Sequence, residues 1–316
     1  MRPRVPSPEI VLPDPSAITL RHFEAFVAVA DERSFSRAAG RLRLAQPTVS
    51  GHVAALERLL GVRLLDREPV PAPTPAGRAL LHRAREALRA RERGIFETLA
   101  AAGTVAGDLG IAGSNIPSAY LLPPRIATFL ARHPKVTVRL WTGDSSEAIE
   151  RVRAGESEVG AVGKKPLDGG LAATVFAEDR VVLVAPRDHP FAARRGIRPA
   201  DLRGRAFVVR EAGSGTAAAA ASALRGVGLD PERDLKVAYE AASTEALREA
   251  VAAGIGLAFL SDRAVARGDG RLRPVRVRGL EIRRSFYLVH AAHRTLSPAA
   301  REFLSIAGSP PAGGAP

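Results

Sequence analysis

Residues 34–61 carry the pattern that most limits what this chain can fold into. Ser34 or Ser36 can cap a helix that runs to Leu42, and a short turn separates it from a helix that begins at Gln46-Pro47. Proline is accepted in a first helical turn because its missing N–H would have no partner there, and Gly61 suits the left-handed end of a helix. The second of these helices has one apolar face, formed by Val49, Val53, Leu56, Leu59 and Leu60. Two helices joined by a tight turn predict a helix-turn-helix.

The flanking segments extend this pattern. An apolar stripe from Leu20 to Ala30 predicts a preceding helix, and the proline-rich stretch 68–77 predicts a short wing. Thr74 can cap a long helix that reaches about residue 103, with apolar positions at steps of three, four and seven. We expect a partner helix from a second subunit to bury this apolar stripe. The alternative is that the stripe packs against the next domain of the same chain.

From about residue 107, short β-type runs alternate with helical stretches, which predicts an α/β domain with a parallel sheet. Four predicted strands lead into helices through polar or glycine-containing segments. These segments contain Ser114, Asn115 and Ile116; Thr142, Asp144 and Ser145; Glu211, Ser214, Gly215 and Thr216; and Ser243. Ser and Thr at such places are ordinary helix caps, and the same groups also suit a carboxylate or phosphate.

Composition narrows the partner and the compartment. The chain has 46 Lys and Arg residues against 33 Asp and Glu, a net charge of +13 that favours a phosphate-bearing partner, although a GC-rich genome also enriches arginine. Six of the basic residues lie between Arg33 and Arg63, with Glu57 as the only acid. There is no cysteine, no signal-peptide core and no membrane-spanning apolar run, so we expect a cytoplasmic protein without a disulfide.

The sequence does not predict an enzyme. There is no G-x-S-x-G elbow, and the Gly213-x-Gly215 pair lacks the lysine of a phosphate loop and the third glycine of a dinucleotide motif. The seven histidines show no H-x-x-x-H spacing, so we expect neither a metal nor a cofactor. A transported-solute receptor would lack the helix-turn-helix, and a structural DNA-binding protein would leave the second half without a role.

The chain resembles the LysR-type transcriptional regulator family. The residues that carry the resemblance are Leu20-Arg21-His22-Phe23-Glu24-Ala25-Phe26, Ser34-Phe35-Ser36-Arg37-Ala38-Ala39, Leu44-Ala45-Gln46-Pro47-Thr48-Val49-Ser50, Leu56-Glu57, Leu59-Leu60-Gly61-Val62, Leu64 and Thr74-Pro75-Ala76-Gly77. They occur in the family's order and spacing, and the resemblance covers about residues 18–306.

The resemblance implies an α+β multidomain protein: a winged helix-turn-helix, a long linker helix and a two-lobed α/β domain like a periplasmic binding protein. The expected segments are a disordered extension over 1–17, the DNA-binding domain over 18–77, a dimerising linker helix over 75–103, an effector-binding domain over 107–306 and a disordered tail over 307–316. Within the effector-binding domain, one lobe would comprise about 107–179 with 280–306, and the other about 180–279.

The resemblance also implies how double-stranded DNA is read. An α-helix fits the major groove, so base edges would be read from the front of the helix that begins at Gln46. Arg37, Arg41 and Arg43 suit phosphates, which fix register without reading sequence. The expected DNA-binding residues are Ser34, Ser36, Arg37, Arg43, Gln46, Pro47, Thr48, Ser50, His52 and Arg67. The wing is one or two residues short, and Pro71, Ala72 and Pro73 stand where the family often has basic or aliphatic residues.

The second half is similar to the subgroup that regulates carbon fixation and cysteine metabolism, through Asn115-Ile116-Pro117-Ser118-Ala119-Tyr120-Leu121-Leu122-Pro123, Arg210-Glu211-Ala212-Gly213-Ser214-Gly215-Thr216, Ala253-Gly254-Ile255-Gly256-Leu257-Ala258 and Ser297-Pro298-Ala299-Ala300. This implies a small anionic effector held between the lobes by the polar junction residues named above. Ala217 stands where the family often has an arginine. The family also implies a dimer or tetramer on interrupted palindromes, with RNA polymerase as a further partner to consider.

Overall fold

The computed structural model describes residues 14–166, 169–266 and 270–308. The chain divides into two compact units, residues 1–95 and 96–316, which we describe separately. Residues 1–13 of the predicted extension and 309–316 of the predicted tail lie outside the described residues. The bounds of both segments differ from those predicted, because Pro15–Ala17 forms a short 3-10 helix (η1) capped by Asp14, and the last helix runs to Gly308.

The first unit contains the three helices that the pattern predicts. They are α1 (Leu20–Glu32), α2 (Phe35–Leu42) and α3 (Gln46–Leu60). The Ser34 hydroxyl accepts a hydrogen bond from the Arg37 amide and caps α2, and Gly61 ends α3 at a φ of 67°. Ala38 and Ala39 are buried, so α2 can approach its neighbours closely. The helices enclose a core around Phe26, Val49, Val53 and Leu56.

The wing is a two-stranded antiparallel hairpin, β1 (Leu65–Asp66) and β2 (Ala72–Pro73). Glu57 of α3 holds it in place: its Oε1 accepts hydrogen bonds from the amides of Leu64 and Leu65, at 2.8 and 3.1 Å. A Cβ atom added to Gly77 would lie 2.0 Å from the Leu64 carbonyl oxygen. Only glycine therefore fits where the next helix meets the wing.

That helix, α4 (Pro75–Ala101), begins at Thr74, whose hydroxyl accepts from the Gly77 amide at 3.0 Å. Leu80, Leu81 and Leu88 pack against the core of the first unit. Farther along, Ile95 and Leu99 are 53% and 39% exposed. The early part of the apolar stripe is therefore covered by the chain's own helices, and the later part is exposed.

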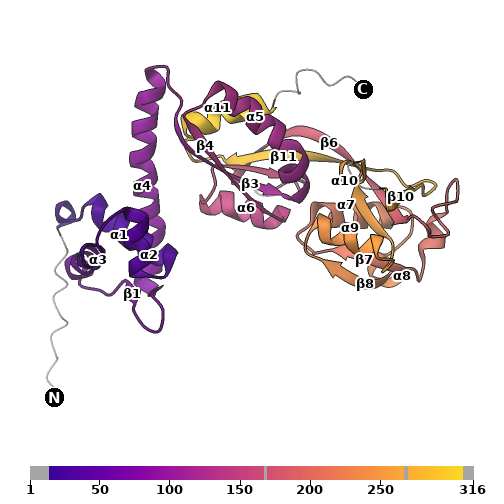
Figure 1. The fold of residues 1–316 in the computed structure, drawn as a ribbon, viewed down its shortest axis with the longest axis horizontal. Helices are drawn as coiled ribbons and strands as arrows, with labels where there is room; N and C mark the ends of the chain where they lie inside the picture. Colours follow the sequence, from indigo (N-terminus) through magenta and orange to yellow (C-terminus); the bar gives the residue numbers. More distant parts are fainter. Residues whose placement is uncertain (1–13, 167–168, 267–269, 309–316) are drawn as a thin grey trace, which may run out of the picture. The chain divides into compact units, whose positions relative to one another are not determined.

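The second unit is built on a seven-stranded mixed sheet (Figure 1) with the order β10-β6-β11-β5-β3-β4, in which β9 also pairs with β6. Its strands are β3 (Gly107–Ser114), β4 (Val136–Gly143), β5 (Val159–Val162), β6 (Leu171–Pro186), β9 (Ala258–Ser261), β10 (Leu272–Val275) and β11 (Ile282–Ala291). β3 runs parallel to β4 and β5. The prediction of a parallel sheet is wrong for the remaining strands, because β6 and β11 pair antiparallel with each other and with their other neighbours.

Two lobes share this sheet. The first lobe contains β3, β4, β5, the first half of β6 and most of β11, with η2 (Pro117–Leu121, a π-helix), α5 (Leu122–Arg132), α6 (Ser145–Ala154) and α11 (Pro298–Gly308). The second half of β6 pairs with β9 and β10 in the second lobe. There, β7 (Ala206–Arg210) and β8 (Lys236–Ala241) form a parallel pair, accompanied by η3 (Pro199–Leu202), α7 (Gly215–Gly226), α8 (Pro231–Asp234), α9 (Thr244–Ala252) and α10 (Asp262–Ala266).

Each lobe has its own hydrophobic core. Phe129, Phe286 and Phe303 lie in the first, and Phe207 and Phe259 stack in the second. β6 and β11 are the strands that run from one lobe into the other (Figure 1). Among the described helices, none is long and apolar enough to cross a membrane.

Candidate functional site

The first turns of α3 form an exposed polar strip. Gln46, Pro47 and Thr48 are exposed, while Ser50 and His52 are half-buried. A Cβ added to Gly51 would meet nothing within 4 Å, so this side of the helix is open. The strip is of the kind that can enter a DNA major groove.

The remaining candidates in this unit surround α2 and the wing. Ser34 caps α2, and Ser36 and Arg37 are exposed on its first turn. Arg43 ends α2 in the left-handed conformation at a φ of 55°, with its side chain exposed. Arg67 lies 5.8 Å from the Phe35 ring centroid and 3.4 Å from the Glu57 carboxylate. Arg37 also lies 3.8 Å from the Glu32 carboxylate, so of these three exposed arginines two already have an intramolecular carboxylate partner.

His52 also contacts a second histidine that the sequence reasoning did not select. The rings of His22 and His52 lie edge to face, with 5.7 Å between their centroids. The His22 Nδ1 accepts a hydrogen bond from the Thr19 amide at 3.1 Å, at the start of α1. Burial, and then the neighbouring His52, lower the pKa of His22. His22 therefore favours its neutral form, which the cap at Thr19 requires.

In the second unit, eight of the eleven predicted effector residues line one cavity between the lobes. They are Ser114, Asn115, Ile116, Asp144, Ser145, Ser214, Gly215 and Thr216. Thr142, Glu211 and Ser243 do not line it: Thr142 is exposed on β4, and Ser243 caps α9. The cavity volume is about 10 Å³, the space of about one water molecule. The lobes are therefore closed on each other in this structure.

Helix N-termini from both lobes meet at this cavity. Asp144 caps α6 by accepting from the Glu147 amide at 2.8 Å, and Ser214 caps α7 by accepting from the Ala217 amide at 3.4 Å. The Ser145 hydroxyl accepts from the Gly163 amide at 3.2 Å. Unpaired amides in the first turn of a helix attract anions.

Two buried arginines complete the cavity, and neither was selected from the sequence. The Arg210 side chain is 3% exposed, and its Nη1 donates to the Thr244 hydroxyl at 2.9 Å. The Arg284 side chain is 7% exposed, and its Nη1 donates to the Thr216 hydroxyl at 3.0 Å. The sequence did contain a signal for Arg284. In a strand, alternate side chains share a face, and Arg284 falls in phase with the apolar Ile282, Phe286 and Leu288.

Carboxylates accompany both arginines. Glu211 pairs with Arg210, and Asp179 accepts from the Nε and one Nη of Arg284. Burial lowers the pKa of Arg284, the Asp179 carboxylate raises it, and the charge of Arg210 lowers it further. An anion placed between the two guanidinium groups would offset the repulsion between them.

Glycines set how closely the lobes approach. A Cβ on Gly213 would lie 2.0 Å from the Asp144 Oδ2, and one on Gly215 would lie 2.7 Å from the Gly163 carbonyl oxygen. Gly163 and Asp144 belong to the first lobe, and Gly213 and Gly215 to the second. Side chains at these two positions would hold the lobes apart.

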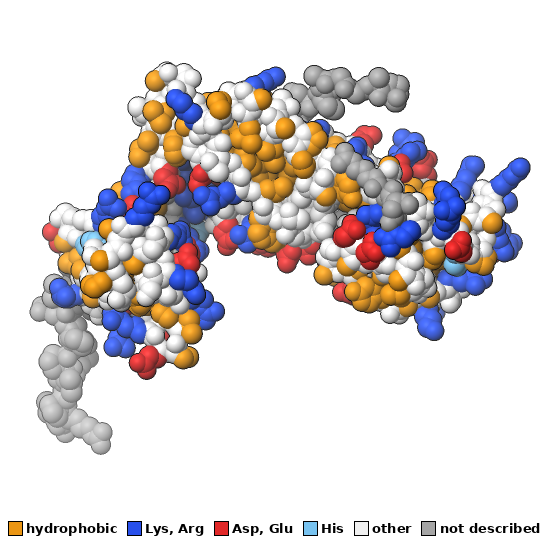
Figure 2. Space-filling view, in the orientation of Figure 1, with side chains coloured by type: hydrophobic (Ala, Val, Ile, Leu, Met, Phe, Trp, Pro, Cys, Tyr) orange, Lys and Arg blue, Asp and Glu red, His pale blue; other side chains and the backbone are white. Residues whose placement is uncertain are grey.

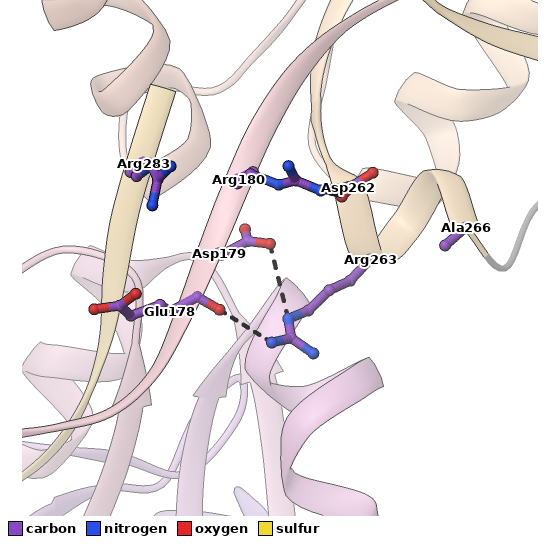
Figure 3. Close-up of a pocket in the computed structure, with 7 residues that line it drawn as sticks. All are labelled: Glu178, Asp179, Arg180, Asp262, Arg263, Ala266 and Arg283. Carbon is purple, nitrogen blue, oxygen red and sulfur yellow. Dashed lines mark hydrogen bonds and ion pairs between the residues drawn. The ribbon is translucent and has the colours of Figure 1, made fainter. Parts of the chain in front are cut away.

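A second, larger cavity of about 510 Å³ lies against β6 and α10 (Figure 3). Arg263 reaches into it from α10 and donates to the Glu178 carbonyl oxygen at 3.0 Å, with its Nε 3.8 Å from Asp179. Two further arginines here form ion pairs, Arg180 with Asp262 and Arg283 with Glu281. No group of three or more potential metal ligands occurs within the described ranges.

Two protein-family models match the chain, one over the α3 strip and one over the interlobe cavity. The model of the "bacterial regulatory helix-turn-helix protein, lysR family" matches residues 20–78, and that of the "LysR substrate binding domain" matches residues 102–309. The chain belongs to the LysR family. It is thus a DNA-binding transcriptional regulator with an effector-binding domain, and the predicted family, fold class and role as an effector-controlled DNA-binding regulator are confirmed.

Its curated relatives are regulators rather than enzymes. The HTH-type transcriptional regulator CysL of Bacillus subtilis (strain 168) is 35% identical over 247 residues, which cover 78% of this chain and 81% of CysL. The RuBisCO operon transcriptional regulator of Acidithiobacillus ferrooxidans is 32% identical over 289 residues, which cover 90% of this chain and 92% of that protein.

Solved structures of LysR regulators have the same fold. Full-length CbnR, solved in complex with its target DNA, aligns with a TM-score of 0.69 at 25% identity over 92% of this chain and 98% of CbnR. The regulatory domain of Synechocystis PCC6803 CcmR, solved in complex with 2-PG, aligns with a TM-score of 0.59 at 26% identity over 64% of this chain and 96% of that domain.

Proposed function

We propose that this regulator is controlled by a small anion bound in the interlobe cavity. The observation that carries the proposal is the meeting of two buried arginines, Arg210 and Arg284, with the N-termini of α6 and α7. The positive ends of the helices and the arginines supply charge, and Ser114, Asn115 and Thr216 supply neutral hydrogen-bonding groups. The cavity of about 10 Å³ has no room for a metabolite, so binding requires the walls of the cavity to move apart.

The DNA-binding role is proposed for the exposed strip at the front of α3. Gln46 suits a bidentate contact to adenine, and Thr48 suits a base or a phosphate. Arg37, Arg43 and Arg67 contact phosphates on either side. The exposed end of the α4 apolar stripe, with Ile95 and Leu99, supports pairing with a second subunit. Two α3 helices, one from each subunit, would then read an interrupted palindrome. We place this activity in the cytoplasm.

The relatives suggest which anions to test first. The structure of the CcmR regulatory domain contains 2-PG, and two relatives regulate a RuBisCO operon. 2-PG and other small phosphorylated or dicarboxylic metabolites are therefore the first probes for this chain.

A thermal unfolding series tests the proposal. A ligand that binds only the folded state raises the unfolding temperature in proportion to the logarithm of its concentration over Kd. We expect at least one anion to stabilise the wild-type protein. Ser214→Trp fills the cavity at the start of α7, and we expect it to abolish that response. Ser222→Trp, an exposed site on the same helix, is the matched control and retains it. An unchanged response in Ser214→Trp would overturn the assignment.

The target DNA is found independently of the effector. Purified protein is incubated with sheared DNA from its own genome, and the retained fragments are sequenced. Enrichment of a few interrupted palindromes is the expected result, with an affinity that falls linearly on a log–log salt plot. Uniform retention of all fragments would contradict sequence reading by α3.

A further inference from the structure

Six exposed arginines gather at one end of the second lobe. We call Arg194, Arg195, Arg198, Arg205, Arg276 and Arg278 the lobe II arginine patch. Figure 2 shows Lys and Arg side chains concentrated at this end of the second unit.

Backbone contacts bring the two segments of the patch together. The Ile197 amide donates to the Arg276 carbonyl oxygen at 2.9 Å, and the Arg278 amide donates to the Ile197 carbonyl oxygen at 2.8 Å. Arg194 and Arg205 both lie over the Phe191 ring, 5.4 and 5.3 Å from its centroid. The six arginines therefore form one surface rather than two separate charged loops.

Most of this positive charge is not compensated. Arg198 pairs with Asp201, but Arg194, Arg195, Arg276 and Arg278 make no ion pair with any carboxylate in the described part of the chain. Elsewhere in the effector-binding domain, exposed arginines such as Arg139, Arg180 and Arg283 do pair with a carboxylate. Within the described residues, the patch thus places four arginines without a carboxylate partner on one surface.

The arginines of the patch also lower the pKa of two neighbouring side chains, Asp201 and His189. The pKa of Asp201 is lowered mainly by its hydrogen bond from the Arg198 amide, and the charges of Arg198 and Arg194 contribute to the same direction. Burial, and then the charge of Arg205, lower the pKa of His189.

The patch has no apolar centre. None of the large hydrophobic side chains that are exposed in the described chain lies in residues 187–205 or 271–283. Protein–protein interfaces are usually centred on buried apolar or aromatic residues. Contact with a nucleic-acid backbone needs no such anchor, because it arises from cations that displace counterions around phosphates. Arginine also matches phosphate with two parallel hydrogen bonds.

We propose that the lobe II arginine patch contacts the phosphate backbone of DNA that flanks the sequence read by α3. The helix-turn-helix holds DNA at high local concentration, so a second weak contact adds affinity without reading sequence. This inference rests on the DNA-binding function of the chain and does not depend on the identity of the effector.

A salt series on the full-length protein tests the contact. The probe is a 60-base-pair duplex of random sequence, and binding is followed by fluorescence anisotropy. Each phosphate contact adds about 0.9 to the slope of log affinity against log salt. We expect the combined variant Arg194→Gln, Arg195→Gln, Arg276→Gln, Arg278→Gln to lower that slope by about two to four. The control carries the same change of charge at exposed sites elsewhere: Arg153→Gln, Arg225→Gln, Arg233→Gln and Arg301→Gln.

Equal slopes for the two quadruple variants would overturn the proposal. If the patch variant instead lost binding to poly-glutamate while keeping its DNA slope, the surface would be assigned to an acidic protein and the DNA contact would be rejected. Equal loss of DNA binding in both variants would also overturn the proposal, because the effect would not be specific to the patch.

A second measurement does not depend on affinity. The chain has no cysteine, so a single introduced cysteine can carry an iron chelate that cuts nearby DNA. Ala193→Cys places the reagent at the patch, and Ala253→Cys places it at an exposed position at the end of α9. On a duplex that carries the recovered operator, we expect cutting from position 193 to exceed cutting from position 253, outside the segment protected by α3. Equal cutting from both positions, or none, would overturn the proposal.

Discussion

Arg284 donates from its Nε and one Nη to the same carboxylate oxygen of Asp179, at 2.9 and 2.8 Å. The other Asp179 oxygen accepts from the Ser261 hydroxyl at 2.9 Å and lies 3.8 Å from the Arg263 Nε. One buried carboxylate therefore connects the interlobe cavity to the larger cavity of Figure 3. It also joins β6 to β11 where both strands pass between the lobes.

We expect Asp179→Asn to destabilise the effector-binding domain by about 3–5 kcal/mol, because it leaves the Arg284 cation buried without its partner. Denaturant unfolding of the full chain measures the change. Asp108→Asn is the control, since it breaks an exposed ion pair with Arg139 and should cost less than about 1 kcal/mol. Equal losses in the two variants would show that the buried pair contributes no more than a surface one.

Gly215→Ala should weaken effector binding by about tenfold or more, because its Cβ would lie 2.7 Å from the Gly163 carbonyl oxygen and hold the lobes apart. Calorimetric titration with the anion that stabilises the wild type gives the affinity. Gly226→Ala, at the other end of α7 with nothing within 4 Å, should bind normally. Normal affinity in both variants would mean that the closed contact is not needed for binding.

Glu57→Ala should destabilise the first unit by about 2–4 kcal/mol, because the buried amides of Leu64 and Leu65 lose their acceptor. Glu57→Gln keeps that acceptor and loses only the exposed contact to Arg67, so its cost should stay below about 1 kcal/mol. Chemical unfolding followed by circular dichroism gives the free energy of unfolding of each variant. A similar cost for both would assign the effect to the ion pair instead of the amides.

Gln46→Ala should cost about 1–3 kcal/mol of DNA affinity and relax preference at one base position. Arg43→Asn, which tolerates the left-handed conformation, should weaken all sequences alike and lower the salt slope by about one. Binding to a set of single-base variants of the recovered operator distinguishes these outcomes. An unchanged base preference in Gln46→Ala would remove Gln46 from base reading.

The stability of the first unit should fall as the pH drops below 6.5. The pKa of His22 is lowered in the folded protein, so the unfolded chain binds the proton more tightly, and stability is lost as the pH falls from 6.5 through the folded pKa. Thermal unfolding at pH 7.5 and 5.5 tests this. His22→Gln retains a capping acceptor and should reduce the dependence. Exposed His293→Gln is the control and should leave it unchanged.

Local rules predicted the first unit well. Ser34 caps α2, Gln46 begins α3 and Gly61 ends it, as expected, because each depends on backbone geometry within a few residues. Thr74 likewise starts the long helix α4. Which part of α4 is covered could not be predicted, since the sequence shows the stripe at Leu80 and at Leu99 alike.

The cavity was predicted only in part, for a physical reason. Ser114, Asp144 and Ser214 follow strands in sequence, so their convergence could be expected from the topology. Arg284 lies in the middle of a strand beside the exposed Arg283, and the alternation of apolar residues indicates only which face it shares, not which charge it pairs with. That partner, Asp179, is about a hundred residues away in the chain, and only the antiparallel register of β6 and β11 brings the two together.

The passage of β6 and β11 through both lobes has a consequence for how this protein is made. The first lobe takes β11 and α11 from residues 282–308, which are synthesised after the whole second lobe. Until those residues leave the ribosome, β5 and the first half of β6 lack the strand that lies between them, and the core around Phe286 and Phe303 is incomplete. A chain terminated before β11 would expose these strand edges to aggregation and proteolysis. The effector-binding domain is thus complete only when the strand and helix that follow its second lobe have been made.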